Sequence, residues 1–208
     1  MLAGAKLQGA LLLVLVALLA AIAFVLVTHR AHDSGPPPVR SAFDGPTMPP
    51  HLRAPDFTLT DQNGRRVSLA ADRGKVVVVT FIHSLCHDTC PFMVEQIKGA
   101  LNDLPGNGRN VPAIGVSADQ REDTPHNRRA FLATHQMTGR MEFVNGSLPT
   151  MRQVWHAWHI QPVTPKVDHS TFVLLIDKRG YERVGFAADQ LTPEGLAHDI
   201  RVLERERA

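Results

Sequence analysis

The run at residues 75–82 (KVVVVTFI) is the feature that most constrains the fold. A strand with one face in water alternates apolar and polar residues, whereas this run offers apolar or β-branched side chains to both faces. Such a strand belongs in the middle of a covered sheet. A second run of the same character follows at residues 171–176 (TFVLLI). The sequence thus predicts a sheet that is buried on both sides.

The segments around these two runs alternate between strand-like and helix-like patterns. The predicted helices are 91–104, 123–135, 148–158 and one that starts at 192, and the further predicted strands are 111–118, 141–144 and 181–186. Asn63-Gly64, between short alternating runs at 57–59 and 67–69, predicts a β-hairpin. This order favours an α/β fold, with a mixed sheet and helices on both of its faces.

Composition excludes several classes of protein. A hydrophobic fraction of 44% over 208 residues excludes intrinsic disorder of the whole chain. The net charge is only +2, and no stripe of Lys and Arg is present, so nucleic acid is not expected as a partner. Two cysteines are too few for a disulfide framework but enough for chemistry at one site.

The N-terminal part predicts a membrane anchor. Residues 7–28 contain no charged side chain and, as a helix, would span about 30 Å, the thickness of a bilayer core. We expect an uncleaved single-pass anchor after a short tail at residues 1–6, because no clear cleavage signal follows the run. A long signal peptide cut near Ala23 or Ala31 is the alternative. The predicted location is the bacterial cell membrane, with the large domain on the extracytoplasmic side.

Residues 29–53 follow the predicted anchor and are rich in proline, including Pro36-Pro37-Pro38 and Pro49-Pro50. Such a composition is typical of a semi-extended tether that folds little by itself. The sequence thus assigns residues 54–208 to the folded domain.

The chemistry concentrates in residues 83–91 (HSLCHDTCP), where Cys86 and Cys90 lie four positions apart between a core strand and a helix. A helix N-terminus favours the thiolate, which is both the nucleophile and the metal ligand. At this separation the two sulfurs can form a disulfide or share one soft metal ion. We interpret Cys86 and Cys90 as a redox-active pair. Two buried structural thiols, or an inert bridge, are the alternatives.

Two better-known thiol motifs fit less well. A thioredoxin-type pair has two residues between its cysteines, whereas this pair has three. A peroxiredoxin has Thr three residues before its reactive Cys, and His83 and His87 occupy those positions here. Both interpretations are therefore weakened.

A third metal ligand is expected from His169, which directly precedes the buried strand at 171–176. One His with two Cys is the soft, low-coordinate set that suits Cu(I), and Asp168 can orient the imidazole. His83 and His87 are candidates for auxiliary metal contacts or for a surface role. A structural role for His169 is the alternative.

Together these motifs resemble the Sco/SenC family of membrane-anchored copper proteins, over residues 54–204. The motifs that carry the resemblance are Cys86-x-x-x-Cys90-Pro91, Asp168-His169-Ser170, Val116-Ser117-Ala118-Asp119, Asp123-Thr124-Pro125 and the opening hairpin 57–64. The chain differs from the family at the residues around its cysteines, where the family usually has an aromatic residue, Thr and Cys-Pro.

The resemblance implies a thioredoxin-like fold with one copper ion bound by Cys86, Cys90 and His169. It also implies a metallochaperone for the binuclear copper centre of cytochrome c oxidase. The expected partner is the copper-centre subunit of that oxidase or another extracytoplasmic cuproprotein. Family members act as copper chaperones, as thiol-disulfide reductants, or both. An extracytoplasmic thiol-disulfide oxidoreductase that carries no copper is the alternative hypothesis.

Overall fold

The computed structural model describes residues 15–25, 41–164 and 170–207. The chain divides into two units, Met1–Arg40 and Ser41–Ala208. In the first unit, residues 15–25 are helical. Among the helices that the structure describes, none has the length and apolar character needed to cross a membrane. The remainder of the predicted anchor, 7–14 and 26–28, lies outside the described residues.

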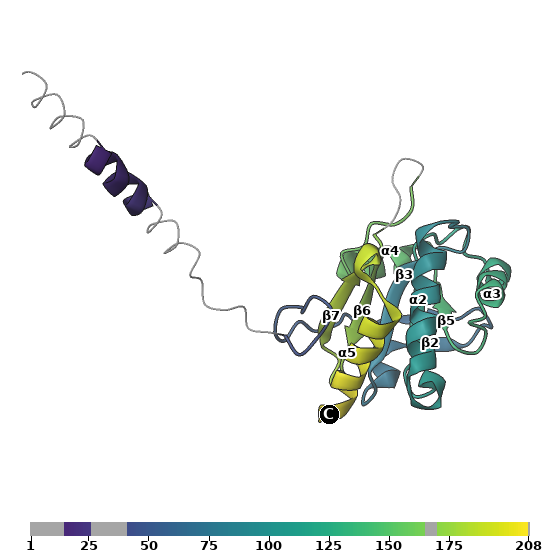
Figure 1. Ribbon diagram of the computed structural model, residues 1–208. Helices are drawn as coiled ribbons and strands as arrows, with labels where there is room; N and C mark the ends of the chain where they lie inside the picture. Colours follow the sequence, from purple (N-terminus) through teal and green to yellow (C-terminus); the bar gives the residue numbers. More distant parts are fainter. Residues whose placement is uncertain (1–14, 26–40, 165–169, 208) are drawn as a thin grey trace, which may run out of the picture. The chain divides into compact units, whose positions relative to one another are not determined.

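A five-stranded sheet forms the centre of the second unit, in the order β5-β4-β3-β6-β7 (Figure 1). Its strands are β3 (Val77–Ile82), β4 (Ala113–Ser117), β5 (Glu142–Val144), β6 (Phe172–Ile176) and β7 (Glu182–Ala187). Strand β3 pairs in parallel with β4, and β4 with β5, whereas β6 runs antiparallel to both β3 and β7. All residues of β3 are buried. The predicted mixed sheet around residues 75–82 is confirmed.

Helices cover both faces of this sheet. They are α2 (Thr89–Asp103), α3 (Pro125–Thr134), α4 (Leu148–Ala157) and α5 (Pro193–Arg205). Val78 and Ile82 of β3 belong to a core shared with α2, α3 and α5, whereas Val77, Val79 and Phe81 belong to a second core that includes α4. In Figure 1, α2 and α5 lie side by side in front of the sheet.

The predicted hairpin consists of β1 (Thr58–Thr60) and β2 (Arg66–Ser68), which pair antiparallel. The turn needs a glycine, because Gly64 has a φ of +83°, in the region that side-chain-bearing residues rarely adopt. The buried carboxylate of Asp61 accepts hydrogen bonds from the backbone N–H groups of Asn63 and Arg65, both at 2.8 Å. Leu59 and Val67 face the second core, so the hairpin covers the same face as α4.

Residues 41–53, which the sequence assigns to the tether, contact β7 and α5. Thr47 bridges to Val184, and the N–H of Gly185 donates to the carbonyl of Pro46 at 3.0 Å. The carboxylate of Asp199 in α5 is fully buried and accepts the N–H groups of Asp44 at 2.8 Å and Gly45 at 2.9 Å. The second unit thus begins at Ser41, earlier than the domain start at residue 54 that the sequence predicts.

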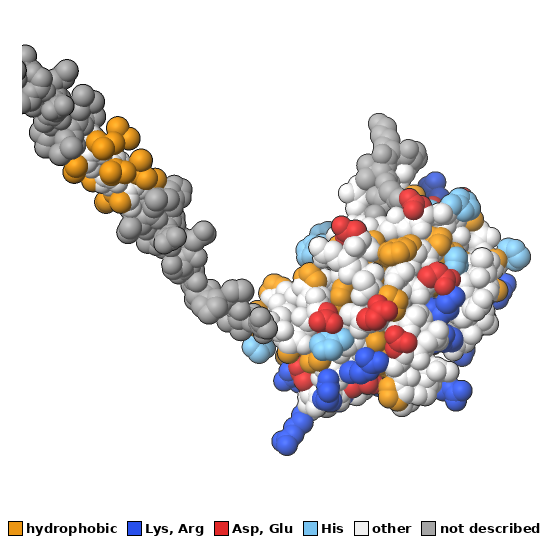
Figure 2. Space-filling model, viewed as in Figure 1, with side chains coloured by type: hydrophobic (Ala, Val, Ile, Leu, Met, Phe, Trp, Pro, Cys, Tyr) orange, Lys and Arg blue, Asp and Glu red, His pale blue; other side chains and the backbone are white. Residues whose placement is uncertain are grey.

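Charged side chains of both signs are interspersed on the face of this unit that carries α2 and α5 (Figure 2). This distribution agrees with the small net charge of +2.

Candidate metal centre

The two cysteines lie at the carboxyl end of the central strand. Strand β3 ends at Ile82, residues 83–88 form a turn, and α2 begins at Thr89. The carboxyl ends of parallel strands are where ligands bind in open α/β sheets, because the loops there converge above the sheet. Cys90 lies in the first turn of α2 and is fully buried in the core, whereas Cys86 is half-buried. The chain therefore carries one accessible and one buried thiol at this position.

The start of α2 differs from the starts of the other three helices described above. In α3, α4 and α5 a Thr or Ser caps the helix, and its hydroxyl accepts a backbone N–H. In α2 the side chain of Asp88 makes no capping bond. Instead the N–H of Cys90 donates to the Sγ of Cys86 at 3.4 Å. This N–H and the helix dipole favour the thiolate form of Cys86.

The sulfurs of the two cysteines converge with a histidine. One ligand atom each of His83, Cys86 and Cys90 lies within 4.8 Å of the other two. Donor atoms around one ion are ~3.5–4 Å apart, given metal–ligand bonds of ~2.0–2.3 Å. A small closing movement would thus place all three on one metal ion. The sequence predicts both cysteines as ligands but gives His83 only as a candidate for an auxiliary contact or a surface role.

The predicted third ligand, His169, and its neighbour Asp168 lie outside the described residues. The strand that follows them is described. Strand β6 pairs antiparallel with β3, with Thr80 opposite Val173, so the start of β6 and the end of β3 lie at the same edge of the sheet. Gln161 and Ser170 exchange two hydrogen bonds at 3.1 and 3.2 Å. The assignment of His169 as a ligand remains a prediction.

The buried carboxylate of Asp123 holds the cysteine loop, a role that the sequence does not predict. Asp123 is 1% exposed. Its Oδ1 accepts the N–H and the hydroxyl of Ser84, both at 2.6 Å, and its Oδ2 accepts the hydroxyl of Ser117 at 2.5 Å. Burial raises the pKa of Asp123, and the hydrogen bonds from Ser117 and Ser84 oppose that rise. Because Ser117 ends β4, Asp123 ties the loop after β3 to the neighbouring strand.

We expect Asp123→Ala to lower the free energy of unfolding by about 2–3 kcal/mol, because it leaves the hydroxyls of Ser84 and Ser117 without their acceptor. Urea unfolding followed by circular dichroism measures this change. Glu122→Ala is the matched control: Glu122 is exposed, so its loss should cost about 0.5 kcal/mol or less. Equal midpoints for the two variants would contradict the role of Asp123.

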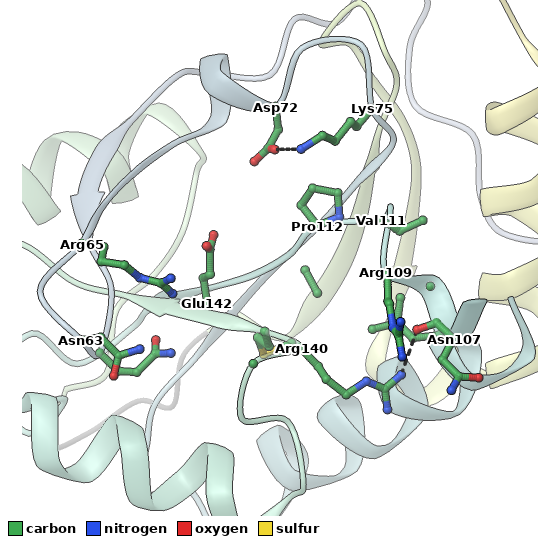
Figure 3. Close-up of a pocket in the computed structure, with 16 residues that line it drawn as sticks. Asn63, Arg65, Asp72, Lys75, Asn107, Arg109, Val111, Pro112, Arg140 and Glu142 are labelled. Atoms are coloured by element: carbon green, nitrogen blue, oxygen red, sulfur yellow. Dashed lines mark hydrogen bonds and ion pairs between the residues drawn. The ribbon is translucent and has the colours of Figure 1, made fainter. Parts of the chain in front are cut away.

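A separate cavity of about 450 Å³ lies at the opposite end of the sheet (Figure 3). Its lining includes Lys75, Pro112 and Glu142, which lie at or just before the starts of β3, β4 and β5. Cations and anions both line it, and Lys75 pairs with Asp72 at 2.8 Å. It contains neither cysteine. This cavity is therefore separate from the candidate metal centre, which lies at the carboxyl end of β3.

Comparison with known proteins identifies relatives of this arrangement. A model of the SCO1/SenC family matches residues 46–204. The chain is 27% identical to Protein sco1 of Schizosaccharomyces pombe, over 69% of this chain and 58% of that protein. It is 29% identical to Protein SenC of Rhodobacter capsulatus, over 69% of this chain and 67% of that protein. The chain spans only about half the length of several curated relatives, such as 47% of the SCO1 protein homolog of Bacillus subtilis.

Solved structures show the same fold. The copper-bound structure of ScoI from Bradyrhizobium japonicum is 26% identical, with a TM-score of 0.63 over 73% of this chain and 99% of that one. BsSco, a member of the Sco family of cytochrome c oxidase assembly proteins in which a disulfide switch was identified, is 21% identical, with a TM-score of 0.66 over 78% and 99%. These likenesses confirm the thioredoxin-like mixed α/β fold that the sequence predicts.

Proposed function

The chain belongs to the SCO1/SenC family, and from this premise we propose that it is a membrane-anchored copper chaperone with Cys86, Cys90 and His169 as ligands. In this role it assists assembly of the binuclear copper centre of cytochrome c oxidase, whose copper-centre subunit is its partner. The copper bound to B. japonicum ScoI supports the choice of metal. The membership of BsSco in a family of cytochrome c oxidase assembly proteins supports the choice of process.

The convergence of the two sulfurs with each other and with the imidazole of His83 is the observation that carries the choice of a soft metal, whereas His169 is proposed from the sequence. Thiolates and imidazole form a soft donor set of low coordination number, which Cu(I) prefers over harder divalent ions. The helix start at Cys90 lowers the cost of holding Cys86 as the thiolate, the form that binds metal. Cys86 is less buried than Cys90, so it is the ligand through which we expect the metal to enter and leave.

The same sulfurs limit when copper can be carried. Oxidation of the thiols of Cys86 and Cys90 to a disulfide removes two electrons and two protons and leaves neither sulfur as a thiolate. Copper binding through these sulfurs therefore requires the reduced pair. The redox state of the pair thus determines whether the protein can hold copper at this site.

We expect His169→Ala to weaken Cu(I) binding, because it removes one of the proposed ligands, and to leave thiol exchange largely intact. Competition of the reduced full-length protein against a chromophoric Cu(I) chelator measures affinity. Reaction with a small disulfide reagent measures exchange. Unchanged copper affinity would exclude His169 as a ligand. The disulfide form of the wild-type protein is the control, since it should bind no copper at this site.

A thiol-disulfide oxidoreductase is the second candidate, and the unequal burial of the two thiols favours it. The accessible Cys86 thiolate would attack a partner disulfide, forming a mixed disulfide and releasing one partner thiolate. The buried Cys90 would then attack the Sγ of Cys86, forming the intramolecular disulfide and releasing the second partner thiol. Two electrons pass to the partner. If the fully reduced protein takes up no Cu(I), this candidate replaces the chaperone.

Exposed apolar side chains beside the thiols support a protein as the partner. Leu85 is 45% exposed and Phe92 is 46% exposed, on either side of Cys86 and Cys90 in the chain. Exposed apolar side chains of this size are typical of protein interaction sites where they form a continuous patch. Copper or electrons would thus pass to a protein that docks on this end of the sheet.

The proposal places residues 7–28 in the membrane as a single-pass anchor and the domain outside the cytoplasm. The 22 uncharged residues of this run and the helix at 15–25 support it. Residues 29–40 then form the link to the structured unit. An oxidised disulfide is stable outside the cytoplasm, so a redox-controlled thiol pair is suited to that compartment.

A further inference from the structure

His83 is the histidine that the structure brings to the two sulfurs. Its ring offers one ligand atom that lies within 4.8 Å of the ligand atoms of Cys86 and Cys90. In the part of the chain that the structure describes, only one other group of His, Cys, Asp or Glu side chains converges so closely, and it contains no sulfur. Two sulfurs and an imidazole nitrogen therefore meet within a single turn between β3 and α2.

The backbone on both sides of His83 is held. Ile82, the residue before it, accepts the N–H of Ala118 at 2.8 Å. Ser84, the residue after it, is fixed to Asp123 by two hydrogen bonds of 2.6 Å. The carbonyl of His83 also accepts the N–H of Cys86 at 3.2 Å, which closes the turn that carries the first sulfur. The imidazole is thus attached to a rigid support, as a ligand of fixed geometry requires.

The second histidine of this segment provides a contrast. His87 follows Cys86 directly, yet it is exposed and does not belong to the converging group. His83 is half-buried beside the sulfurs. The two histidines differ in their position in the loop. His83 directly follows the last residue of β3, whereas His87 lies two residues before the start of α2.

We propose that His83 is a copper ligand, so that residues 83–90 alone carry a complete set of one nitrogen and two sulfur donors. This inference rests on the proposed copper-binding function. Three such donors suffice for Cu(I), which accepts low coordination numbers. In this arrangement His83 supplies the first nitrogen ligand, and His169 supplies a second one. The loop can hold the metal without His169, which comes from a different part of the chain.

The test measures Cu(I) affinity of the reduced full-length protein in detergent, for His83→Phe, His87→Phe, His169→Ala and the double variant His83→Phe/His169→Ala. Phenylalanine keeps the ring volume and removes the nitrogens. His83→Phe should lower affinity at least about tenfold, which is the loss that removal of an outer-shell partner already causes. His87→Phe should not change it. The double variant should bind far more weakly than either single variant.

A second readout does not depend on the affinities of the variants, which serve only to assign the signals. Cu(I) is diamagnetic, so long-range ¹H–¹⁵N spectra of the imidazole rings can be recorded with the metal bound. A ring nitrogen of His83 should shift on addition of one equivalent of Cu(I), and those of His87 should not. His83→Gln identifies the His83 signals if His83→Phe fails to fold.

The outcomes separate the two proposals. If the wild-type protein binds Cu(I), but its His83 signals stay in place and His83→Phe binds as tightly as His87→Phe, the role of His83 is refuted and the copper chaperone stands. If the reduced wild-type protein takes up no Cu(I), the proposed function itself fails, and the His83 ligand fails with it.

Discussion

Replacing either cysteine by serine should abolish tight Cu(I) binding, and the two variants should then differ from each other in thiol chemistry. Each substitution exchanges a soft thiolate for a hydroxyl that does not ionise near neutral pH. We expect affinity to fall by more than the roughly 10–100-fold that loss of an outer-shell partner causes. The remaining thiol is accessible in Cys90→Ser and buried in Cys86→Ser. Cys90→Ser should therefore form a stable mixed disulfide with a small disulfide reagent, and Cys86→Ser should react slowly.

Chelator competition and intact-protein mass spectrometry measure these two effects on the same samples. Thr89→Ser is the matched control, because it lies in the same stretch and keeps both thiols. Its copper stoichiometry and exchange rate should equal those of the wild-type protein. Copper uptake by Cys86→Ser at wild-type affinity would exclude the thiol pair as the metal site. Equal reactivity of the two single-cysteine variants would contradict the assignment of Cys86 as the attacking thiol.

The sequence predicted the elements that build this site, because each has a strong local signal. The run at residues 75–82 offers apolar or β-branched side chains to both faces over most of its length, and its residues Val77–Ile82 form the fully buried β3. Thr124 and Thr192 each precede a proline, and each caps a helix that begins there. The cysteine pair was expected between a core strand and a helix, and the structure places it there. These features depend only on residues close together in the chain.

Features that depend on long-range contacts were not predicted. Asp123 has the local pattern of a helix start, yet its carboxylate holds Ser84, which is 39 positions earlier in the chain. Spacing also does not distinguish His83 from His87 as a neighbour of the sulfurs, because the direction of the turn after β3 decides which ring points inward. Contacts of residues 41–53 depend on the free edge of β7, which a Pro-rich composition does not reveal.

Removing residues 1–53 should destabilise the domain strongly, whereas removing residues 1–40 should not. The shorter fragment loses Asp44 and Gly45, whose N–H groups both donate to the carboxylate of Asp199. That carboxylate is fully buried in α5, so truncation leaves a buried charge without these donors. Hydrogen bonds to charged groups contribute about 1.5–3 kcal/mol each, so we expect a loss of roughly 3 kcal/mol or more. The edge of β7 also loses its pairing at Val184.

Thermal and urea unfolding of fragments 41–208 and 54–208 measure this difference, and point variants in the longer fragment isolate its cause. Asp199→Asn replaces one acceptor oxygen by an NH₂ group, so it should reproduce a large part of the loss. Asp189→Asn, at an exposed position, should change stability by about 0.5 kcal/mol or less. Equal stability of the two fragments would show that residues 41–53 do not contribute to the fold. If the loss is found, copper and thiol measurements on a soluble fragment need residues 41–53, since an unfolded domain would not hold the loop at 83–90 in place.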